Sequence, residues 1–343
     1  MKPKVTIKEI AKECGVSITT VSRVMNNIEG SCSLETENKI KTAIKKLGYH
    51  PNPVARSLVT KRTNIIGIII PDISNFFFQD FAKGAEKILN KKKYRLVLCS
   101  TEGSKDKEDS FLLSLSNGFA DGIIVTTQNA EEEDDNIVYL NNKKFPIIAV
   151  ERYGEIIKDV ASVTLDNAMG LYLAMKSLVE NGHEKIAFIA GPENAHNANL
   201  RKAGYLKAIH DFNLKMDEDL IIHGDYKIES GYQCMKDLLK NKKFTAFVAA
   251  NDLMAIGACR AIREAGMSIP EDISAIGFDG TILAELHQPP LTTISIHGEE
   301  MGKIAATNLI KLIEGKKLKQ KHEIVKSEIK QGGSVKKLNK VSV

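Results

Sequence analysis

Apolar and polar positions in the first turns of the chain alternate with helical spacing. Ile7, Ile10 and Ala11 fall on one face of a short segment, which predicts an amphipathic helix. Thr6 and Glu9 precede and enter this segment with the S/T-x-x-E spacing of a capping box, in which each side chain satisfies a backbone N–H at a helix start. The pattern therefore predicts a capped helix beginning directly after Thr6.

A second short helix follows after one glycine. Gly15 supplies the turn, because glycine adopts a positive φ at little cost, and Ser17 is placed to cap a helix that starts at Ile18. Val21 and Val24 point inward in this helix, and the outward positions are Ile18, Thr19, Ser22 and Arg23. Two small helices joined by a glycine turn match the helix-turn-helix, whose second helix enters the DNA major groove.

The pattern predicts a third helix over 34–47, capped by Ser33 and ended by Gly48. Two prolines, at 51 and 53, then mark a boundary. Pro53 can open a helix of about two turns over 53–59, which is too short to be stable alone.

Beyond Asn64, short apolar runs alternate with helical stretches. The predicted strands are 65–70, 95–99, 122–126, 147–150, 163–165, 186–190, 220–223, 246–249 and 273–278, and the predicted helices are 77–91, 168–181, 198–212, 229–239, 253–265 and 299–313. Nearly continuous apolar strands that alternate with helices predict parallel sheets covered on both faces. The number of strands favours two α/β lobes, with the run 291–296 as a late crossover between them and a ligand cleft at the carboxyl ends of the strands.

Charge distinguishes the amino-terminal segment from the rest. Residues 1–60 hold ten Lys/Arg and five Asp/Glu, whereas the whole chain of 343 residues has a net charge of +5, so residues 61–343 sum to zero. A basic patch joined to helix-turn-helix geometry favours nucleic-acid binding, because phosphate contacts need charge and groove readout needs shape.

Composition excludes several other classes. Five scattered cysteines without a CxxC pair predict reduced thiols in the cytoplasm and neither a disulfide framework nor a zinc site. We expect no signal peptide, no membrane span and no cofactor, because no apolar run has the required length and no metal or cofactor motif occurs. The sequence lacks HExxH, GxSxG and P-loop motifs, and His183 and His196 stand alone, so no catalytic residue is predicted.

The chain resembles the LacI/GalR family of bacterial transcription regulators. The resemblance rests on TIKEIAKECGVSITTVSRVMN, LGYHPNPVARSL, GIIIPDISNFFF, GHEKIAFIAGP with RKAGY after it, ANDLMAIGA, IGFDG and PPLTTI, which cover nearly the whole chain in family order. It implies a dimeric regulator with a core shaped like periplasmic sugar-binding proteins. Departures are Ile18 and Thr19 in place of larger polar base-readers, Glu37 at a commonly basic position, and the absence of the arginine usual before Gly333-Ser334.

The fold class expected is therefore α/β, with an N-terminal all-α helix-turn-helix domain and a two-lobed periplasmic-binding-protein-like core of parallel sheets. The domains are predicted at 1–48 (DNA-binding), 49–61 (hinge with a short helix) and 62–343 (effector binding and dimerisation). Within the core, the first lobe is predicted at 62–161 with 291–320, and the second at 162–290 with 321–335.

The DNA-binding residues expected lie in the first helices and the hinge. Direct base readout is assigned to Ile18, Thr19 and Arg23, since arginine can donate twice to guanine and methyl groups can touch thymine. The alternatives are a plain phosphate contact for Arg23 and a structural hydroxyl for Thr20. Phosphate or positioning contacts are assigned to Ser17, Thr20, Ser22 and Asn26, and the remaining DNA-binding residues expected are Thr6 and Asn52.

The resemblance adds a hinge role to three residues. It places Leu58 where family members insert a leucine into the minor groove, a wedge that bends the duplex, with packing on its own core as the alternative. Ala55 is small enough for two hinge helices to approach, and Arg56 can reach phosphate.

The family pattern places effector-binding side chains on both sides of the cleft. Carboxylates, amides and one guanidinium suit a polyhydroxyl ligand, and aromatic faces can stack on a sugar ring. The residues assigned are Asp72, Asn75, Phe76, Phe77, Asp166, Asn197, Arg201, Asn251 and Asp279. Alternatives are helix capping by Asp72 and Asn251, and a structural ion pair for Arg201 and Asp279.

The partners expected are a pseudo-palindromic double-stranded operator, a small-molecule effector such as a carbohydrate, and a second copy of the chain. The function expected is a DNA-binding regulator, acting as a repressor under effector control. The alternative is a carbon catabolite regulator controlled by a phosphorylated phosphocarrier protein. The tail from Lys316 holds nine lysines and no sustained apolar heptad, which predicts a dimer without a tetramerising coiled coil.

Overall fold

The chain forms two compact units, Met1–Thr63 and Asn64–Val343, in the computed structural model. The structure describes residues 5–26, 28, 30–49, 57, 60–126, 135–151, 157–241 and 243–338. Most of the predicted hinge, including Asn52, Ala55, Arg56 and Leu58, lies outside the described residues. The two units are described separately below.

The described part of the N-terminal unit contains the helices α1 (Ile7–Cys14), α2 (Ile18–Met25) and α3 (Leu34–Leu47). The backbone N–H of Thr6 donates to the Glu9 carboxylate over 2.6 Å, and the Ser17 hydroxyl accepts from the Thr20 amide over 3.0 Å. Gly15 ends α1 with φ of 69°. Ile10, Val21 and Ile40 meet in the core with no exposed surface, so the predicted helices, caps and inward positions are confirmed.

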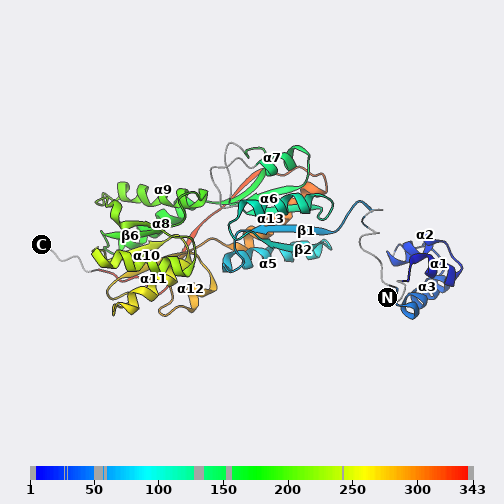
Figure 1. Ribbon diagram of the computed structural model, residues 1–343, viewed down its shortest axis with the longest axis horizontal. Helices are drawn as coiled ribbons and strands as arrows, with labels where there is room; N and C mark the ends of the chain where they lie inside the picture. Colours follow the sequence, from blue (N-terminus) through cyan, green and yellow to red (C-terminus); the bar gives the residue numbers. More distant parts are fainter. Residues whose placement is uncertain are drawn as a thin grey trace. The chain divides into compact units, whose positions relative to one another are not determined.

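The second unit holds two six-stranded sheets, each with helices on both sides (Figure 1). The first sheet is entirely parallel, and its order is β11 (His322–Val325), β5 (Ala161–Leu165), β4 (Ile147–Val150), β3 (Gly122–Thr126), β1 (Ile65–Ile70) and β2 (Arg95–Ser100). The second runs β12 (Glu328–Lys330), β10 (Thr292–Ser295), β9 (Ser274–Asp279), β8 (Ala246–Ala249), β6 (Ile186–Ala190) and β7 (Ile221–His223), with only β12 antiparallel. We call each sheet with its helices the first or second lobe.

Both faces of the first sheet are buried. Ile68 faces the helices α5 (Phe76–Lys91) and α13 (Gly298–Ile313), and Ile69 faces α6 (Lys105–Ser116) and α7 (Asp135–Asn142). This two-sided burial explains why β1 reads as an unbroken apolar run. The second lobe carries α8 (Asn167–Glu180), α9 (His196–Asp211), α10 (Ile228–Asn241), α11 (Asp252–Glu264), α12 (Ile282–Leu286) and the 3₁₀ turn Glu218–Leu220.

The predicted lobe boundaries are wrong at three strands. β5 and β11 pair in the first sheet, although the sequence placed both segments in the second lobe. β10 pairs with β9 in the second sheet, although 291–320 was predicted for the first lobe and this run as a crossover. The chain therefore crosses between the lobes three times, just after β5, β10 and β11. Strands this short can join either sheet, and only their long-range pairing decides.

Three helices, α6, α7 and α12, escaped prediction. In α6 a charged first turn and serines interrupt the apolar stripe, while α7 and α12 are short. Such segments carry little of the periodicity on which sequence-based assignment depends.

The carboxyl-terminal segment is firmly held without the arginine that the family pattern contains. Ser334 is fully buried; its hydroxyl donates to the Ala275 carbonyl over 2.6 Å and accepts from the Thr292 amide over 2.8 Å. Buried His183 hydrogen-bonds to Thr245 and to the Lys336 carbonyl, so this histidine has a structural role.

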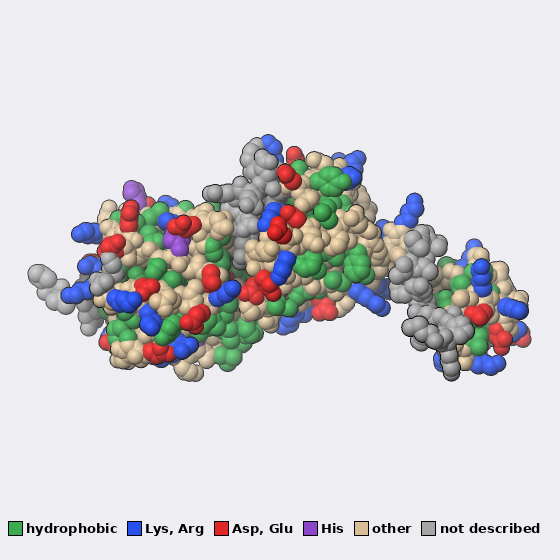
Figure 2. All heavy atoms as spheres, in the orientation of Figure 1, with side chains coloured by type: hydrophobic (Ala, Val, Ile, Leu, Met, Phe, Trp, Pro, Cys, Tyr) green, Lys and Arg blue, Asp and Glu red, His purple; other side chains and the backbone are tan. Residues whose placement is uncertain are grey.

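Charged side chains of both signs are scattered over the visible face of the molecule, among hydrophobic and other side chains (Figure 2). None of the helices in the described part of the chain is long and apolar enough to cross a membrane. Among the described residues, no cluster of three or more His, Cys, Asp or Glu side chains could hold a metal ion, and all five cysteines are free thiols.

Candidate functional site

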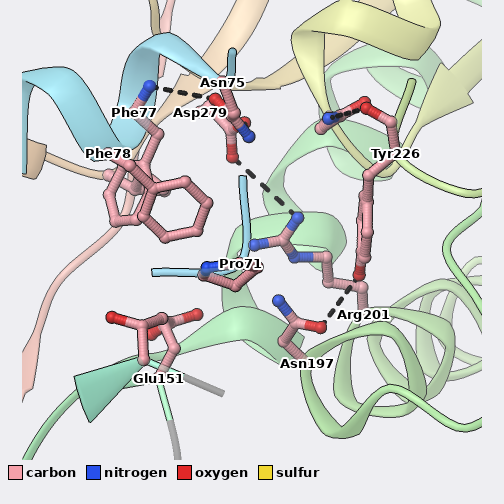
Figure 3. A pocket seen from close by; sticks show the side chains of 12 residues that line it. Pro71, Asn75, Phe77, Phe78, Glu151, Asn197, Arg201, Tyr226 and Asp279 are labelled. Atoms are coloured by element: carbon pink, nitrogen blue, oxygen red, sulfur yellow. Dashed lines mark hydrogen bonds and ion pairs between the residues drawn. The ribbon is translucent and has the colours of Figure 1, made fainter. Parts of the chain in front are cut away.

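A cavity lies where the strand ends of the two lobes meet (Figure 3). Its volume is about 420 Å³ with the open mouth included. The lining combines aromatic rings with amides, carboxyls and one guanidinium: Pro71, Asn75, Phe77, Phe78, Thr126, Glu151, Asn197, Arg201, Tyr226, Asn251, Asp279 and Ile296. Apolar walls with a few converging polar groups are typical of small-molecule sites.

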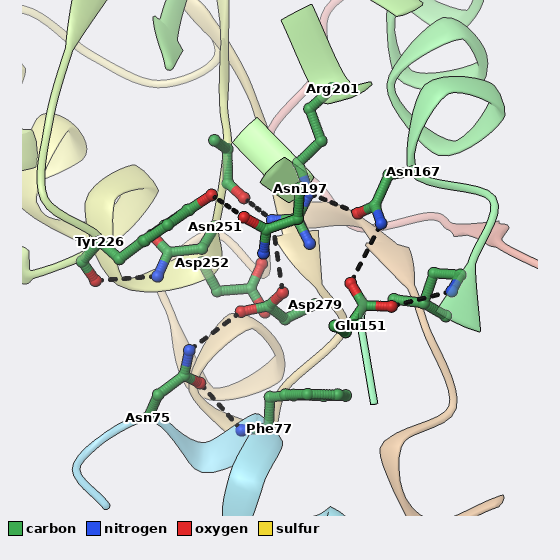
Figure 4. Close-up of polar contacts among 12 residues, drawn as sticks. Asn75, Phe77, Glu151, Asn167, Asn197, Arg201, Tyr226, Asn251, Asp252 and Asp279 are labelled. Atoms are coloured by element: carbon green, nitrogen blue, oxygen red, sulfur yellow. Dashed lines mark hydrogen bonds and ion pairs between the residues drawn. The ribbon is translucent and has the colours of Figure 1, made fainter. Parts of the chain in front are cut away.

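Asn75 belongs to the first lobe and reaches the second. Its side-chain oxygen accepts from the Phe77 amide over 2.9 Å, which caps α5 and fixes the side chain. Its nitrogen lies 3.5 Å from the Asp279 carboxylate of the second lobe (Figure 4). One side chain thus caps a helix and contacts the opposite wall of the cavity.

Arg201 is buried on α9 and held on several sides. Its Nε donates to Asn167 over 2.8 Å, a second guanidinium nitrogen donates to the Ala250 carbonyl, and the guanidinium lies 3.8 Å above the Phe278 ring. The closest nitrogen to Asp279 is 4.0 Å from its carboxylate. A guanidinium fixed in this way presents its remaining donors in a defined direction.

Asp279 ends β9 with φ of 118°, a strained conformation for a residue other than glycine. Burial raises the pKa of its carboxyl well above the ordinary value, Arg201 opposes this shift, and the neighbouring Asp252 adds to it. Strain and an unfavourably placed charge at one cavity residue are typical of functional sites.

Asp252 is not part of the cavity lining, but it stabilises the chain segment that follows Asp279. Its carboxylate accepts from the amide and hydroxyl of Thr281, both over 2.8 Å, and from the Thr293 hydroxyl over 2.6 Å. Burial raises the pKa of Asp252 to about 6 despite these hydrogen bonds.

A chain of hydrogen bonds links three further lining residues. Asn251 caps α11 by accepting from the Met254 amide over 2.9 Å, and its amide donates to the Tyr226 carbonyl over 2.8 Å. The Tyr226 hydroxyl donates to Asn197 over 2.9 Å, and burial raises the pKa of that hydroxyl. The predicted capping role of Asn251 is therefore real and coexists with its place in the cavity wall.

Glu151 and Thr126 stand at the ends of β4 and β3. The Glu151 carboxylate accepts from the Leu165 amide over 2.8 Å and from the Asn167 side chain of the second lobe over 3.0 Å, and burial raises its pKa. The Thr126 hydroxyl is buried and has no hydrogen-bond partner among the described residues. A buried hydroxyl without a partner is costly, so a ligand atom is its natural complement.

In the N-terminal unit, α2 presents an exposed outer face. Ile18 is 43% exposed, and Thr19 and Arg23 are also exposed, whereas Val21 and Val24 face the core. This is the face expected to enter a DNA groove.

Residues 6–52 match the family model of bacterial regulatory proteins of the lacI family, and residues 175–335 match a periplasmic binding protein-like domain. The regulator RegA of Clostridium saccharobutylicum is 38% identical over 94% of this chain and 97% of its own. The chain belongs to the lacI family. Catabolite control protein A of Priestia megaterium is 35% identical over 90% of this regulator and 92% of its own chain.

Solved structures support the same assignment. A lac repressor dimer bound to operator and the anti-inducer ONPF has a TM-score of 0.86 at 25% identity, covering 97% of this regulator and 99% of that chain. A complex of the regulator CelR with cellobiose has a TM-score of 0.73 at 27% identity, covering 96% and 100%. The predicted family, fold class and function as a transcriptional regulator are confirmed, and the relatives are regulators and not enzymes.

The structure places six of the nine effector-binding residues predicted for this LacI-family regulator in the cavity: Asn75, Phe77, Asn197, Arg201, Asn251 and Asp279. Three are not in its lining. Asp72 accepts from the Ser74 amide beside a neighbouring opening, exposed Asp166 caps α8 through the Met169 amide, and Phe76 is the first residue of α5.

No role was predicted for Glu151, Tyr226 or Thr126. Glu151 and Thr126 stand at or directly after the ends of correctly predicted strands, so the rule that ligands bind at carboxyl ends could have identified both. Tyr226 stands three residues beyond the end of β7, which was also predicted, so the same rule indicates only the loop that contains it.

Among the described DNA-binding residues of this regulator, several also have local structural roles. The Thr20 hydroxyl lies 2.9 Å from that of Ser17, and the Asn26 amide donates to the Ser22 carbonyl over 2.8 Å. The Thr6 hydroxyl bonds to the Glu9 carboxylate over 3.0 Å. Thr19 and Arg23 are exposed, which suits contact with DNA.

Proposed function

We propose that a polyhydroxyl metabolite of the carbohydrate class binds the cavity and controls DNA binding by a dimer of this regulator. The observation that carries the proposal is the mixed lining of one buried cavity by both lobes. Asn75 and Thr126 come from the first lobe, and Arg201, Asn251 and Asp279 come from the second. Amide, carboxyl and guanidinium groups can pair with adjacent hydroxyls, and the Phe77 and Phe78 rings can cover an apolar sugar face.

The link from ligand to DNA follows from the connectivity of the lobes. Three crossovers join them, so a ligand that contacts both favours one relative arrangement. It can shift that equilibrium only by its differential affinity for the two arrangements. In the proposed mechanism, one arrangement holds the hinge helices of a dimer together on a pseudo-palindromic operator, and the other separates them.

A ligand panel tests the effector class. Pentoses, hexoses, disaccharides and sugar phosphates are screened by thermal shift, because a ligand that binds the folded state stabilises it. Thr126→Val is the most informative variant, since it replaces by an isosteric methyl group a hydroxyl that has no partner within the described part of the chain. We expect its unliganded melting temperature to equal or exceed that of the wild type, and its affinity for the active sugar to fall about tenfold.

Two controls accompany the panel. Ser177→Ala, on α8 away from the cavity lining, is expected to leave sugar affinity unchanged. DNA binding is then measured with and without the active ligand at fixed salt. A panel in which no polyhydroxyl compound stabilises the protein would refute the carbohydrate class.

The second candidate is control by a phosphorylated phosphocarrier protein, and it is supported by the similarity to catabolite control protein A. A pull-down with the serine-phosphorylated and unphosphorylated carrier separates the two proposals. Capture that depends on the phosphoryl group, together with an inactive sugar panel, would favour this candidate.

A further inference from the structure

One edge of the first lobe is strongly basic. The six strands of its sheet are parallel, so every segment that leads into a strand reaches the same edge. Within the core unit these segments are 64–65, 91–95, 116–122, 142–147, 157–161 and 313–322. We call this surface the amino edge of the first lobe.

The amino edge holds eleven lysine and arginine side chains against three carboxylates. All eleven are exposed: Lys91, Lys92, Lys93, Arg95, Lys143, Lys144, Lys158, Lys316, Lys317, Lys319 and Lys321. The carboxylates are Asp121, Asp159 and Glu314; Glu314 pairs with Lys92 and Lys316, and Asp159 pairs with Lys321. Pairing at this edge therefore leaves a large excess of positive charge.

The corresponding edge of the second lobe has the opposite sign. Its entry segments, 180–186, 211–221, 241–246, 264–274 and 286–292, contain three lysines against nine carboxylates among the described residues. The segment 331–338, which leaves the antiparallel strand β12 at the same edge, adds Lys336 and Lys337, so carboxylates still outnumber lysines by nine to five. Since both lobes have the same architecture, the fold does not impose the charge. A basic amino edge on only one of two similar lobes indicates a partner for that edge.

The position of the edge identifies the partner. The chain passes from the helix-turn-helix unit into the core at this edge, where the Asn64 carbonyl accepts from the Arg95 amide over 2.8 Å and the Asn64 amide donates to Asp121 over 2.9 Å. The chain between Tyr49 and Asn64 can span at most about 50 Å. Any duplex held by the first unit is therefore kept at high effective concentration near the amino edge.

We infer that the amino edge of the first lobe is a second DNA-contacting surface, which binds backbone phosphates beside the segment that the helix-turn-helix reads. Exposed lysines act as flexible point charges, which suit phosphate contacts and carry no base information. Lys317 and Lys319 also line a hollow between the ends of α5 and α13, together with Lys92, Lys311 and Lys316. The surface adds affinity for any sequence and leaves discrimination to α2. This inference rests on DNA binding by the N-terminal unit.

The test neutralises the edge in the full-length protein. The variant Arg95→Gln/Lys317→Gln/Lys319→Gln removes three positive charges outside the ion pairs named above. Binding to an operator duplex and to a random duplex is measured by fluorescence anisotropy between 50 and 200 mM salt. If the three side chains contact phosphates, the slope of log affinity against log salt concentration falls in magnitude by about two to three per protomer, or about five for a dimer. Affinity should fall by a similar factor for both duplexes.

The matched control is Lys185→Gln/Lys215→Gln/Lys243→Gln, which makes the same charge change on the second lobe's exposed surface. It should leave the slope unchanged, and the conservative variant Lys317→Arg/Lys319→Arg should bind like the wild type. Equal losses in the two triple variants would mean a long-range field without contact and would overturn the inference. An unchanged salt dependence of DNA affinity in the edge variant would also overturn the inference. So would a variant that loses binding to an acidic protein but still binds both duplexes like the wild type. A wild-type protein that binds no duplex would instead refute the proposed function.

Discussion

The Asp252 carboxyl illustrates how single residues in the core are tuned by burial. It is fully buried and accepts three hydrogen bonds from two threonines, yet burial raises its pKa from 3.8 to about 6. The desolvation penalty on the charge therefore exceeds the gain from its donors. Asp252 stabilises the cavity wall next to Asp279, but its buried charge lowers the free energy of unfolding by an amount that depends on pH.

This cost leads to a prediction for stability. The folded state binds the Asp252 proton more tightly than the unfolded chain, so the free energy of unfolding should fall as pH rises from about 4 to about 6 and level off above. The contribution is about 2–3 kcal/mol. Urea unfolding of the wild type and of Asp252→Asn from pH 4 to 7 measures it, because the variant lacks this titration.

The quantity to compare is the difference in the free energy of unfolding between the wild type and Asp252→Asn, since other carboxyls titrate in both proteins. Glu299, for example, has its pKa lowered to about 2 by Lys303 and Lys87, so in the unfolded chain of both proteins it still releases its proton within this window, and its effect cancels in the difference. Parallel curves for wild type and variant from pH 4 to 6 would contradict the prediction.

The sequence predicted which residues line the cavity better than it predicted the contacts that these residues make. Asn75, Arg201 and Asp279 were identified from the family pattern, and the structure places Asn75 within hydrogen-bonding distance and Arg201 within ion-pairing distance of Asp279. The hydrogen bond between Glu151 and Asn167 could not be predicted from the sequence, because the two residues belong to different lobes and are brought together only by the crossover after β5.

Helices in the core unit pair closely through glycines. A Cβ at Gly302 of α13 would lie 2.0 Å from the Phe81 carbonyl oxygen of α5, and one at Gly84 of α5 would lie 1.9 Å from the Glu299 carbonyl oxygen. The same arrangement joins α10 to α11, where a Cβ at Gly257 would meet the Ile228 carbonyl at 1.9 Å. Backbone rather than side chain blocks each added methyl, so relief requires the helices to separate.

Gly302→Ala is therefore expected to destabilise the core. The clash should cost about 2–3 kcal/mol even after the better helix propensity of alanine is included. Chemical unfolding measures the loss, and Lys303→Ala on the exposed side of the same helix serves as the control, with an expected change within about 0.5 kcal/mol. Wild-type stability in Gly302→Ala would show that α5 and α13 can move apart freely.

Two compact units with separate hydrophobic cores predict two thermal transitions. Ligand binding in the core should raise only the transition of residues 64–343, by a stabilisation of about 2.7 kcal/mol at a ligand concentration one hundred times Kd. Differential scanning calorimetry with the active sugar measures both transitions. A common shift of the whole profile would contradict this prediction and indicate one cooperative unit.

The sequence by itself determined the local features of this regulator. Helix caps such as Thr6 and Ser17, the glycine turn at Gly15 and the apolar strands depend on interactions within a few residues, and they were predicted to within about two residues. Tertiary structure alone decided which sheet receives β5, β10 and β11, since strand pairing is a long-range choice that a short apolar run leaves open. It also decided which carboxyls share the cavity and that four separate basic segments reach one surface, because parallel strands bring distant segments to a common edge.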